Sequence, residues 1–345
     1  MKNPDYNILE NTMNALMLKH WGIVLIKEGE PLFTEKVHTF NSENSIFDTV
    51  HSKEATVIAI AVPYRLTSDY KCPGVSYGKV EAFAWDYDYH VEIKGILVKV
   101  LNQLENQFDQ KFEQVDFCVD NSPYNDREVA FYAGLGSVGK NHLLIHPVLG
   151  TRFFIGYIVI KNHLLYSELP INQSIQSDRF EGCESCGRCV SACPTKVCGY
   201  EVTQMNLCLS EMTQTKELIE EVNRINFKRQ LYGCSICQEV CPANSNTSIS
   251  TCNSFLLTSH TSNWIELFDL LKMTSSAFKT KFGKMGFAWR PLWVYKRNAL
   301  IILSGSKSMM VLERLKEEKY LEKDERLGEY YKWAINRLCI STTDG

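Results

Sequence analysis

The sequence of 345 residues predicts an α+β protein built from three successive parts. Within residues 1–165, short apolar runs alternate with segments that carry apolar residues at helical spacing, which is typical of an α/β domain. Between Cys183 and Pro242 the cysteines are dense and regularly spaced. From residue 255 onward the apolar residues recur at helical spacing without strand-like alternation. We therefore expect domains at 1–165, 166–254 and 255–345.

The first part is predicted to alternate buried strands with one-faced helices. The clearest strand, 55–62, reads as a buried strand and stops at Pro63, which cannot donate to a sheet. The clearest helix, 91–108, carries its apolar residues on one face. Strand 115–120 should deliver Asp120 to its carboxyl end. The remaining expected elements are a helix at 8–21, a strand at 22–26, a helix at 127–132, two strands of a meander at 143–145 and 153–160, and helices at 207–227, 264–271, 298–303, 309–319 and 327–338.

The cysteine-rich part contains two related runs. They read Cys183-x2-Cys186-x2-Cys189-x3-Cys193-Pro194 and Cys234-x2-Cys237-x3-Cys241-Pro242, with Cys208 between them. Eight thiolates in this spacing can hold two [4Fe–4S] clusters, and in such paired motifs the last cysteine of each run ligates the other cluster. The expected ligand sets are Cys183, Cys186, Cys189 and Cys241 for cluster 1, and Cys193, Cys208, Cys234 and Cys237 for cluster 2. Zinc and disulfides are the alternatives, although zinc ribbons seldom use or repeat this run.

Composition and charge bound the remaining possibilities. Hydrophobic residues make up 45% and charged residues 22%, which describes an ordinary globular protein. The first residues lack a signal-peptide pattern, and no apolar run approaches the length of a membrane span. We expect a cytoplasmic protein with no membrane contact. Five cysteines fall outside the eight-ligand scheme and are interpreted as spare thiols: Cys72, Cys118, Cys198, Cys252 and Cys339.

Three features of the first part can carry chemistry. Gly134, Gly136 and Gly139 form G-x-G-x-x-G, but the pattern follows a helix and leads into a strand, the reverse of a dinucleotide fingerprint. It can approach a phosphate or an amide-rich ligand, or it can be a plain tight turn. Asp120 stands at a strand end, where an Asp is often only a helix cap or an ion-pair partner. His90 follows two aromatic residues and is equally ambiguous.

The combination of motifs resembles the epoxyqueuosine reductase family. The motifs lie in the order Asp88-Tyr89-His90, Val119-Asp120-x-Ser-Pro, Ala133-Gly134-Leu135-Gly136-x-x-Gly139-Lys140-Asn141, and then the two cysteine runs. The resemblance implies a nitroreductase-like N-terminal α/β domain, a ferredoxin-like two-[4Fe–4S] domain and a C-terminal helical HEAT-like segment. It also implies a cobalamin between the first two domains. The implied reaction reduces epoxyqueuosine at the wobble position of certain tRNAs to queuosine.

The resemblance also implies residue roles. Asp120 would be the proton donor, Tyr89, His90 and Arg127 would lie near the same pocket, and the corrinoid would be contacted by the loop residues Gly134, Gly136, Ser137, Gly139, Lys140 and Asn141. Removing an epoxide oxygen to leave an alkene takes two electrons and two protons and releases water, so low-potential clusters suit it. A dry pocket would raise the pKa of Asp120 and let it protonate the departing oxygen.

Two observations bear on the substrate. Family members usually carry a bulky residue where this chain has Ser137, so another substrate, including a small molecule, is an alternative. An electron-transfer protein without corrinoid is a further alternative. A tRNA substrate should leave a basic footprint. The segment 279–297 is basic, lacks acidic residues and is interleaved with aromatics, so we expect tRNA contacts from Arg290, Lys296 and Arg297, unless the segment is only a solvated face. The electron donor is not identified, and nothing demands more than a monomer.

Overall fold

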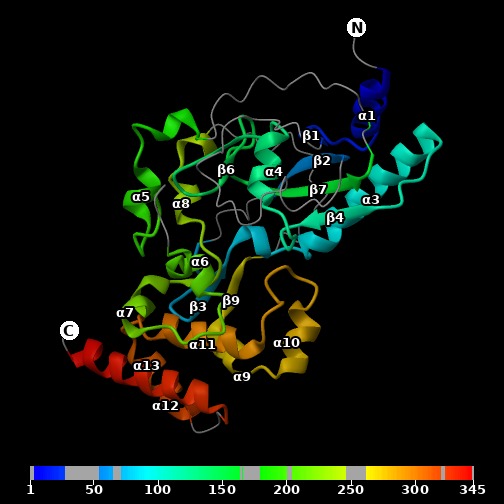
Figure 1. The fold of residues 1–345 in the computed structure, drawn as a ribbon. Coiled ribbons are helices and arrows are strands. Elements are labelled where there is room, and N and C mark those ends of the chain that lie inside the picture. The colour runs from blue at the N-terminus through cyan, green and yellow to red at the C-terminus, as the bar shows by residue number, and fades with distance from the viewer. Residues whose placement is uncertain are drawn as a thin grey trace.

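The computed structural model describes residues 4–27, 54–64, 71–163, 165, 179–199, 204–245, 262–319 and 323–343. Figure 1 shows an upper body that contains the longest strands and a lower body that contains the C-terminal helices. The cysteine-rich segment, with α5 (Arg188–Ala192) and α8 (Ile236–Glu239), runs along one side of the upper body and continues into the lower one. Cys252 lies outside the described residues.

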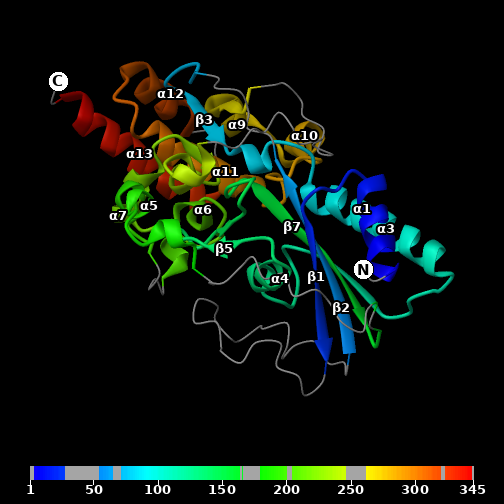
Figure 2. The same ribbon diagram turned by 90° about the horizontal axis from the view of Figure 1, so that it is seen from above.

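The upper body is built on a four-stranded antiparallel sheet. Its strands, in spatial order, are β1 (Trp21–Lys27), β2 (Glu54–Pro63), β7 (Phe153–Lys161) and β4 (Val115–Val119). Helices α1 (Pro4–Ala15) and α3 (Tyr89–Phe108) cover one face, and α4 (Asp126–Tyr132) covers the other (Figure 2). The predicted strands at 22–26, 55–62 and 115–120 and the helices at 91–108 and 127–132 are confirmed.

The sandwich explains why β2 is largely apolar. Alternate side chains of a strand point to opposite faces. Ile58 and Ile60 therefore enter the core under α1 and α3, whereas Val57 and Ala59 enter the core under α4. All four residues are fully buried. A strand with helices on both faces buries nearly all of its side chains, and its buried Thr56 hydroxyl donates to a backbone carbonyl oxygen.

The predicted meander is wrong. Strand β6 (Leu144–Ile145) pairs with β5 (Ser137–Val138) in a separate two-stranded hairpin, and β7 pairs with β2 and β4 instead. His146 and Gly150 form a bridge with each other, which closes the turn after β6 before the chain enters the main sheet. The apolar β6 is short because it packs over α4, not because it lies at a sheet edge.

The lower body draws on all three predicted parts. Its three-stranded sheet has the order β8 (Gln230–Tyr232), β3 (Tyr77–Val80) and β9 (Trp264–Glu266). Strand β3 pairs parallel to β8 and antiparallel to β9, so a segment of the first part is the central strand of this core. The expected boundary near residue 165 therefore does not separate two independent cores, and the three ranges stay a prediction. The strand β9 also corrects the helix expected to begin at 264.

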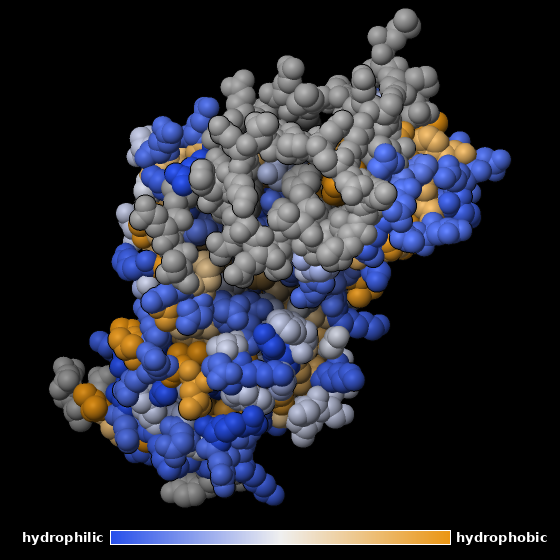
Figure 3. Space-filling view, in the orientation of Figure 1, coloured by the Kyte–Doolittle hydropathy of each residue, from blue (hydrophilic) through white to orange (hydrophobic). Residues whose placement is uncertain are grey.

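Five helices complete the lower body. They are α9 (Leu267–Lys272), α10 (Ser275–Phe282), α11 (Leu292–Leu303), α12 (Met309–Lys319) and α13 (Glu325–Thr343). Helix α11 is the buried axis, with most of its side chains inside the core. On the visible face, hydrophilic side chains dominate the lower body, and apolar ones gather near α7 (Glu221–Arg224), where Leu218, Val222 and Ile225 are exposed (Figure 3). Within the described ranges, every helix is too short or too polar to cross a membrane.

The single helix predicted at 207–227 is wrong. The chain forms α6 (Leu209–Met212), a non-helical connection, α7 and then a short 3-10 turn, Ile225–Phe227. The break has a physical cause. The Arg297 guanidinium donates to the carbonyl oxygens of Met212, Thr215 and Glu217. These oxygens are satisfied by a side chain from α11, so the backbone does not need helical hydrogen bonds there.

Candidate functional site

The candidate site forms where the carboxyl end of β4 meets the start of α3. Asp120 follows β4 with a φ of 59°, the left-handed region that Asp and Asn tolerate better than other non-glycine residues. The Ser122 amide donates to the Asp120 carbonyl oxygen at 2.9 Å and closes a tight turn. The Asp120 side chain is 62% exposed. The turn therefore presents the carboxylate outward from the sheet edge, as the sequence predicted.

Helix α3 brings two further side chains to this carboxylate. Asp88 caps the helix by accepting from the His90 amide, so Tyr89 and His90 are its first residues. The Tyr89 hydroxyl donates to Asp120 Oδ2 at 2.7 Å, and His90 Nε2 lies 3.5 Å from the same oxygen. His90 Nδ1 lies 2.7 Å from Asp88 Oδ1. The structure thus brings together three of the predicted site residues, which lie about thirty positions apart in the sequence.

Close packing beneath α3 fixes the position of Tyr89. A Cβ on Gly156 of β7 would lie 2.4 Å from Ile93 Cγ2, so only glycine lets α3 approach the sheet this closely. The Tyr89 ring then stacks on Phe154 of β7, with ring centroids 4.0 Å apart and planes within 7°. Stacking on a strand residue restrains the ring and aims its hydroxyl at Asp120.

The charges at the site differ from the sequence-based expectation. Contact with His90 and the hydrogen bond from Tyr89 lower the pKa of the Asp120 carboxyl below its ordinary 3.8. The pKa of His90 is raised above 6.5, chiefly by Asp120 and then by Asp88. The expectation of a raised pKa at Asp120 is therefore wrong for the ligand-free site, because the carboxylate is exposed to water and lies beside a cation. The two shifts together favour a charged carboxylate beside a protonated imidazole.

A second carboxyl, Asp126, is buried behind the turn. It accepts from Ser122 Oγ at 2.8 Å and from the Tyr157 hydroxyl. Burial raises the pKa of Asp126 to about 6, and the nearby Asp120 charge adds to this effect. Ser122 belongs to the turn that follows Asp120, so its hydrogen bond to Asp126 holds this turn in place. The sequence offered only a weak signal, an acidic residue in the first turn of α4 after the capping Asn125.

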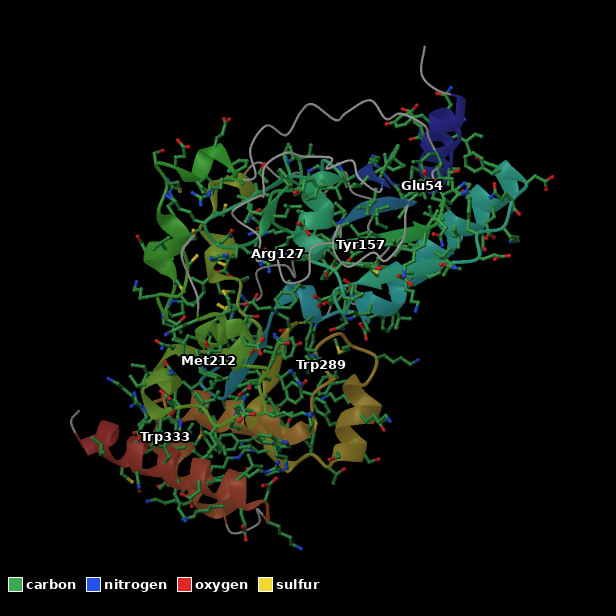
Figure 4. The ribbon with its side chains drawn as sticks, viewed as in Figure 1. Glu54, Arg127, Tyr157, Met212, Trp289 and Trp333 are labelled. Atoms are coloured by element: carbon green, nitrogen blue, oxygen red, sulfur yellow. The ribbon has the colours of Figure 1, made fainter. Side chains whose placement is uncertain are left out.

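Arg127 lies beside this pair of carboxylates. Its Nη1 donates to the carbonyl oxygen of His142, and its positive charge contributes to the lowered pKa of Asp120. Figure 4 shows Arg127 on α4 in the upper body, with Tyr157 on the neighbouring strand β7. The structure therefore places Arg127 near the predicted pocket, where it tethers the loop that follows β5.

The glycine-rich loop is a tight hairpin rather than a phosphate cradle. Gly134 has a φ of 78°, and a Cβ on Gly136 would lie 2.3 Å from the Ile145 carbonyl oxygen. The Gly139 amide donates to the Leu143 carbonyl oxygen, so it is not available to a ligand. Ser137 pairs with Ile145 in the hairpin. The glycines are explained by this geometry, and a cofactor contact from the loop stays a prediction.

Two side chains of the same loop point elsewhere. Lys140 donates to the carbonyl oxygens of Glu184 and Cys186 at 3.0 and 3.3 Å. Its charge therefore lies against the first cysteine run, and its expected contact with a ligand of the glycine loop stays a prediction. The Asn141 Oδ1 accepts from the Leu143 amide, whereas its Nδ2 is buried without a hydrogen-bond partner among the described residues. This donor is free for a ligand.

The cysteines of the two runs lie near one another, and their division into two ligand sets stays a prediction. Burial and the nearby thiolate charges of Cys183, Cys189 and Cys186 raise the pKa of Cys241. These are the four residues expected for cluster 1. Among the described residues no three side chains converge on a single metal ion, whereas a cubane needs four sulfurs around a larger body. Crowded buried thiolates need compensating cations, which iron supplies.

The second group behaves in the same way. Burial raises the pKa of Cys234 to about 12, and the charges of Cys208 and Cys193 add to the shift. Cys237 is likewise raised to about 12, with Cys234 and Cys208 among its neighbours. All twelve described cysteines are free, so the disulfide alternative finds no support among them. The Cys198 thiol also lies near Cys189, Cys237 and Cys193, which are predicted ligands, although Cys198 itself is interpreted from the sequence as a spare thiol.

The ligand assignment predicts different outcomes for two neighbouring cysteines. We expect Cys208→Ser to lose cluster 2 and about half of the iron, because Cys208 is one of its four thiolates. Cys198→Ser should keep both clusters, because Cys198 stands outside both sets. Iron and sulfide analysis with electron paramagnetic resonance of the dithionite-reduced proteins measures this. Loss of a cluster from Cys198→Ser, or full iron in Cys208→Ser, contradicts the assignment.

A cavity of about 590 Å³ lies between the upper body and the second cysteine run. Its walls include the aromatic rings of Tyr64 and Phe83, and Ser235 and Ile236 between two predicted cluster ligands. It also contains three cations that form no ion pair with a described residue: Lys71, Arg152 and Lys228. The Tyr64 and Phe154 ring centroids are 5.1 Å apart, and Phe154 stacks on Tyr89. A continuous aromatic wall therefore joins this cavity to the Asp120 site.

The predicted basic footprint divides into separate parts. Arg297 is fully buried and makes structural hydrogen bonds, so its predicted tRNA contact is wrong. Lys296 lines a different cavity of about 480 Å³, together with Glu318 and Asp324. Arg290 lies over the Trp289 ring. Lys279, Lys281 and Lys284 are exposed. A basic run in the sequence is thus not one basic surface, because a helix distributes neighbouring residues over different faces.

Several known proteins are similar to this chain in sequence or in fold. A model of the 4Fe-4S double cluster binding domain matches residues 182–244. The epoxyqueuosine reductase of Lactococcus garvieae is 31% identical over 290 residues, which cover 82% of this chain and 78% of that protein. The structure of epoxyqueuosine reductase from Streptococcus thermophilus superposes with a TM-score of 0.78 at 24% identity, covering 96% of this chain and 90% of that one.

A further solved structure contains epoxyqueuosine reductase with a tRNA-Tyr epoxyqueuosine-modified stem loop. Its TM-score is 0.74 at 24% identity, and the match covers 97% of this chain and 91% of that chain. At this identity the two structural matches establish the fold. The 31% identical relative, matched over most of both chains, establishes the family.

Proposed function

Because the chain belongs to the epoxyqueuosine reductase family, we propose that it reduces epoxyqueuosine in tRNA to queuosine at the Asp120 site. The observation that carries this proposal is the meeting of Tyr89, His90 and Asp120 on one oxygen atom, Asp120 Oδ2. The reaction consumes two electrons and two protons and releases the epoxide oxygen as water. The site supplies a carboxylate to deliver a proton and a protonated imidazole to replace it.

The proton handling follows from the pKa directions. In the ligand-free site, water reaches Asp120 and the proton stays on His90. Exclusion of water by a bound substrate raises the pKa of a carboxyl group. We infer that the proton then moves from His90 to Asp120, which passes it to the epoxide oxygen as negative charge develops there. Tyr89 orients Asp120 through its hydrogen bond, and Asp88 stabilises the imidazolium.

The cofactor assignment divides into an established part and a proposed part. The double-cluster family match covers all eight predicted ligands. We propose that a cobalamin binds as well, and it would supply low-potential electrons at the reacting carbon–oxygen bond. Two observations fit it. Asn141 Nδ2 is a buried donor without a described partner, suited to an amide-rich ligand. The cavity beside Cys234 has aromatic walls and unpaired cations, suited to a phosphodiester.

The remaining contacts with the cofactor, the substrate and the electron donor are also proposals. Tyr89, His90 and Arg127 would border the cofactor and substrate, with Ser137 and the loop glycines at its edge. Arg290 and Lys296 would contact the tRNA, whereas Arg297 would not. A low-potential carrier would donate single electrons to the clusters. We propose that the protein is a monomer. We also propose that it works in the cytoplasm, because a reducing compartment keeps cysteines free.

The direct test is turnover of an epoxyqueuosine-containing anticodon stem-loop. The reconstituted protein receives a strong one-electron donor under anaerobic conditions, and nucleoside mass spectrometry reads the product. We expect the mass of the modified nucleoside to fall by one oxygen atom. Omission of cobalamin should abolish turnover while the cluster spectra remain. Unchanged nucleoside with fully loaded protein overturns the proposal.

The raised pKa of His90 predicts the pH dependence. His90 must be protonated to replace the proton that Asp120 delivers, so kcat/KM should fall as pH rises through the raised pKa, above 6.5. Asp88→Asn removes one of the carboxylates that stabilise the imidazolium, so this fall should move to lower pH. Asn still caps α3, which preserves the helix. Rates measured from pH 6 to 9 give the profile.

The matched control is Asp109→Asn at the other end of the same helix. Asp109 caps the carboxyl end of α3 in the left-handed conformation, which Asn also tolerates. Its pH profile should match that of the wild type. An Asp88→Asn profile that coincides with the wild type would show that His90 does not hold the transferred proton.

A further inference from the structure

An exposed aromatic–cation pair stands just before α11. The Trp289 side chain is 58% exposed, and the Arg290 guanidinium carbon lies 3.6 Å from the Trp289 ring centroid. Arg290 forms no ion pair with a described residue, and its buried Nε has no hydrogen-bond partner among them. An exposed indole under an uncompensated cation contributes little to folding stability. Apolar area that stays in contact with water gives no burial free energy.

Both residues are held rigidly despite their exposure. The Trp289 Nε1–H donates to the Tyr232 hydroxyl at 2.7 Å, which fixes the edge of the indole. The Arg290 amide donates to the hydroxyl of the buried Tyr295 at 3.2 Å. The indole edge and the Arg290 backbone are therefore fixed before a ligand binds, which lowers the cost of ordering the indole on binding.

The pair lies at the rim of the Asp120 site. The backbone of 284–287 bonds to the segment that leads into α3: the Asp88 amide donates to the Lys284 carbonyl, and the Phe287 amide donates to the Ala84 carbonyl, both at 3.0 Å. Tyr232, which holds Trp289, lies close enough to Asp120 and Asp88 to feel both charges. Figure 4 shows Trp289 where the lower body faces the upper one, whereas Trp333 lies toward the far end of α13.

We propose that Trp289 stacks on a base of the anticodon loop next to the modified nucleoside, while Arg290 binds a phosphate of the same loop. This inference rests on the proposed function. Single-stranded loop bases are typically bound by stacking on aromatic side chains, and Arg guanidinium groups pair with phosphates. The stacked base would position the modified nucleoside over Asp120. Trp289 and Arg290 are thus positioning residues, and of the three predicted tRNA contacts Arg290 is the one that lies nearest to the Asp120 site.

The test compares binding of an anticodon stem-loop by holoprotein variants. Trp289→Ala should weaken binding roughly 5- to 150-fold, the range for loss of one base–aromatic stack, and Trp289→Phe should restore most of it. Arg290→Ala should reduce the salt dependence of binding by about one phosphate contact, a change of about 0.7 in the slope of log affinity against log salt. In both variants the weaker binding should raise KM more than it lowers kcat.

A spectroscopic readout separates stacking from a merely structural role. 2-Aminopurine placed beside the wobble position should lose fluorescence on binding to wild-type protein and to Trp289→Phe, but not to Trp289→Ala. Trp333→Ala is the matched control, because Trp333 also stacks with an arginine, Arg224 at 4.6 Å, but lies far from the site. It should bind and quench as the wild type does.

The outcomes distinguish the two proposals. Wild-type protein that neither binds nor reduces the stem-loop refutes the proposed function. Wild-type protein that does both, while Trp289→Ala binds and quenches equally well, refutes the stacking inference alone. Loss of binding in Trp289→Ala together with equal loss in Trp333→Ala also refutes it, because the effect would then be structural.

Discussion

Asp120→Asn is expected to lower turnover of the epoxyqueuosine stem-loop by roughly 10²- to 10⁴-fold, the usual contribution of a positioned proton donor. The substitution is conservative in every other respect. Asn tolerates the left-handed backbone at this position, where φ is 59°. The amide oxygen can still accept from the Tyr89 hydroxyl. What it cannot do is take the proton of His90 and pass it on.

Spectra and binding complete this measurement. The cluster signals, cobalamin retention and stem-loop affinity of Asp120→Asn should match those of the wild type, so that the loss falls on kcat. Tyr89→Phe is the matched comparison, because it removes only the hydrogen bond that orients Asp120 and should cost far less. Turnover of Asp120→Asn close to that of the wild type would remove the proton-donor role.

Arg297→Met is expected to destabilise the protein by about 3–5 kcal/mol without touching the substrate. Arg297 is fully buried, and it donates to the carbonyl oxygens of Met212, Thr215 and Glu217. Methionine fills similar space but leaves these acceptors buried and unsatisfied, which costs several kcal/mol. For a chain of this length, one-step unfolding would then occur roughly 4–7 °C lower. Burial lowers the pKa of Arg297 to about 10, so it remains charged at neutral pH.

Anaerobic thermal unfolding of the holoprotein measures the effect. Arg290→Met is the control, because Arg290 lies over an exposed ring and its loss should leave the midpoint nearly unchanged. The order reverses for stem-loop affinity at permissive temperature, where Arg290→Met should bind less tightly and Arg297→Met should bind normally. An unchanged midpoint in Arg297→Met would refute its structural role.

The parts that the sequence predicted correctly are those controlled by local chemistry. The apolar run at 55–62 and the one-faced pattern at 91–108 lead to β2 and α3, because strand and helix periodicities are properties of neighbouring residues. The cysteine spacing predicted a two-cluster domain, which the family match over residues 182–244 supports, since short spacings position sulfurs around one cluster. Asp120 was recognised because it follows a strand directly.

The parts that the sequence did not predict depend on distant contacts. The broken helix at 207–227 follows from Arg297, some eighty residues away, which takes the place of helical hydrogen bonds. The same contact converts a basic residue of the expected tRNA surface into a core residue. Strand β3 pairs with β8 and β9 in the lower body, whereas the longer strands of the first part form the sheet of the upper body.

The amino-acid sequence by itself determined the two-cluster domain, the main strands and helices, and the identity of the carboxylate at the end of β4. Only the tertiary structure decided which group holds the proton and which cations face the substrate. The reason is physical. A ligand set and a helix depend on spacing along the chain, whereas a pKa and an exposed surface depend on charges, burial and hydrogen bonds from other elements. The pKa of His90 is raised because β4 places Asp120 beside it, and Arg297 is excluded from the surface because α11 carries it into the core.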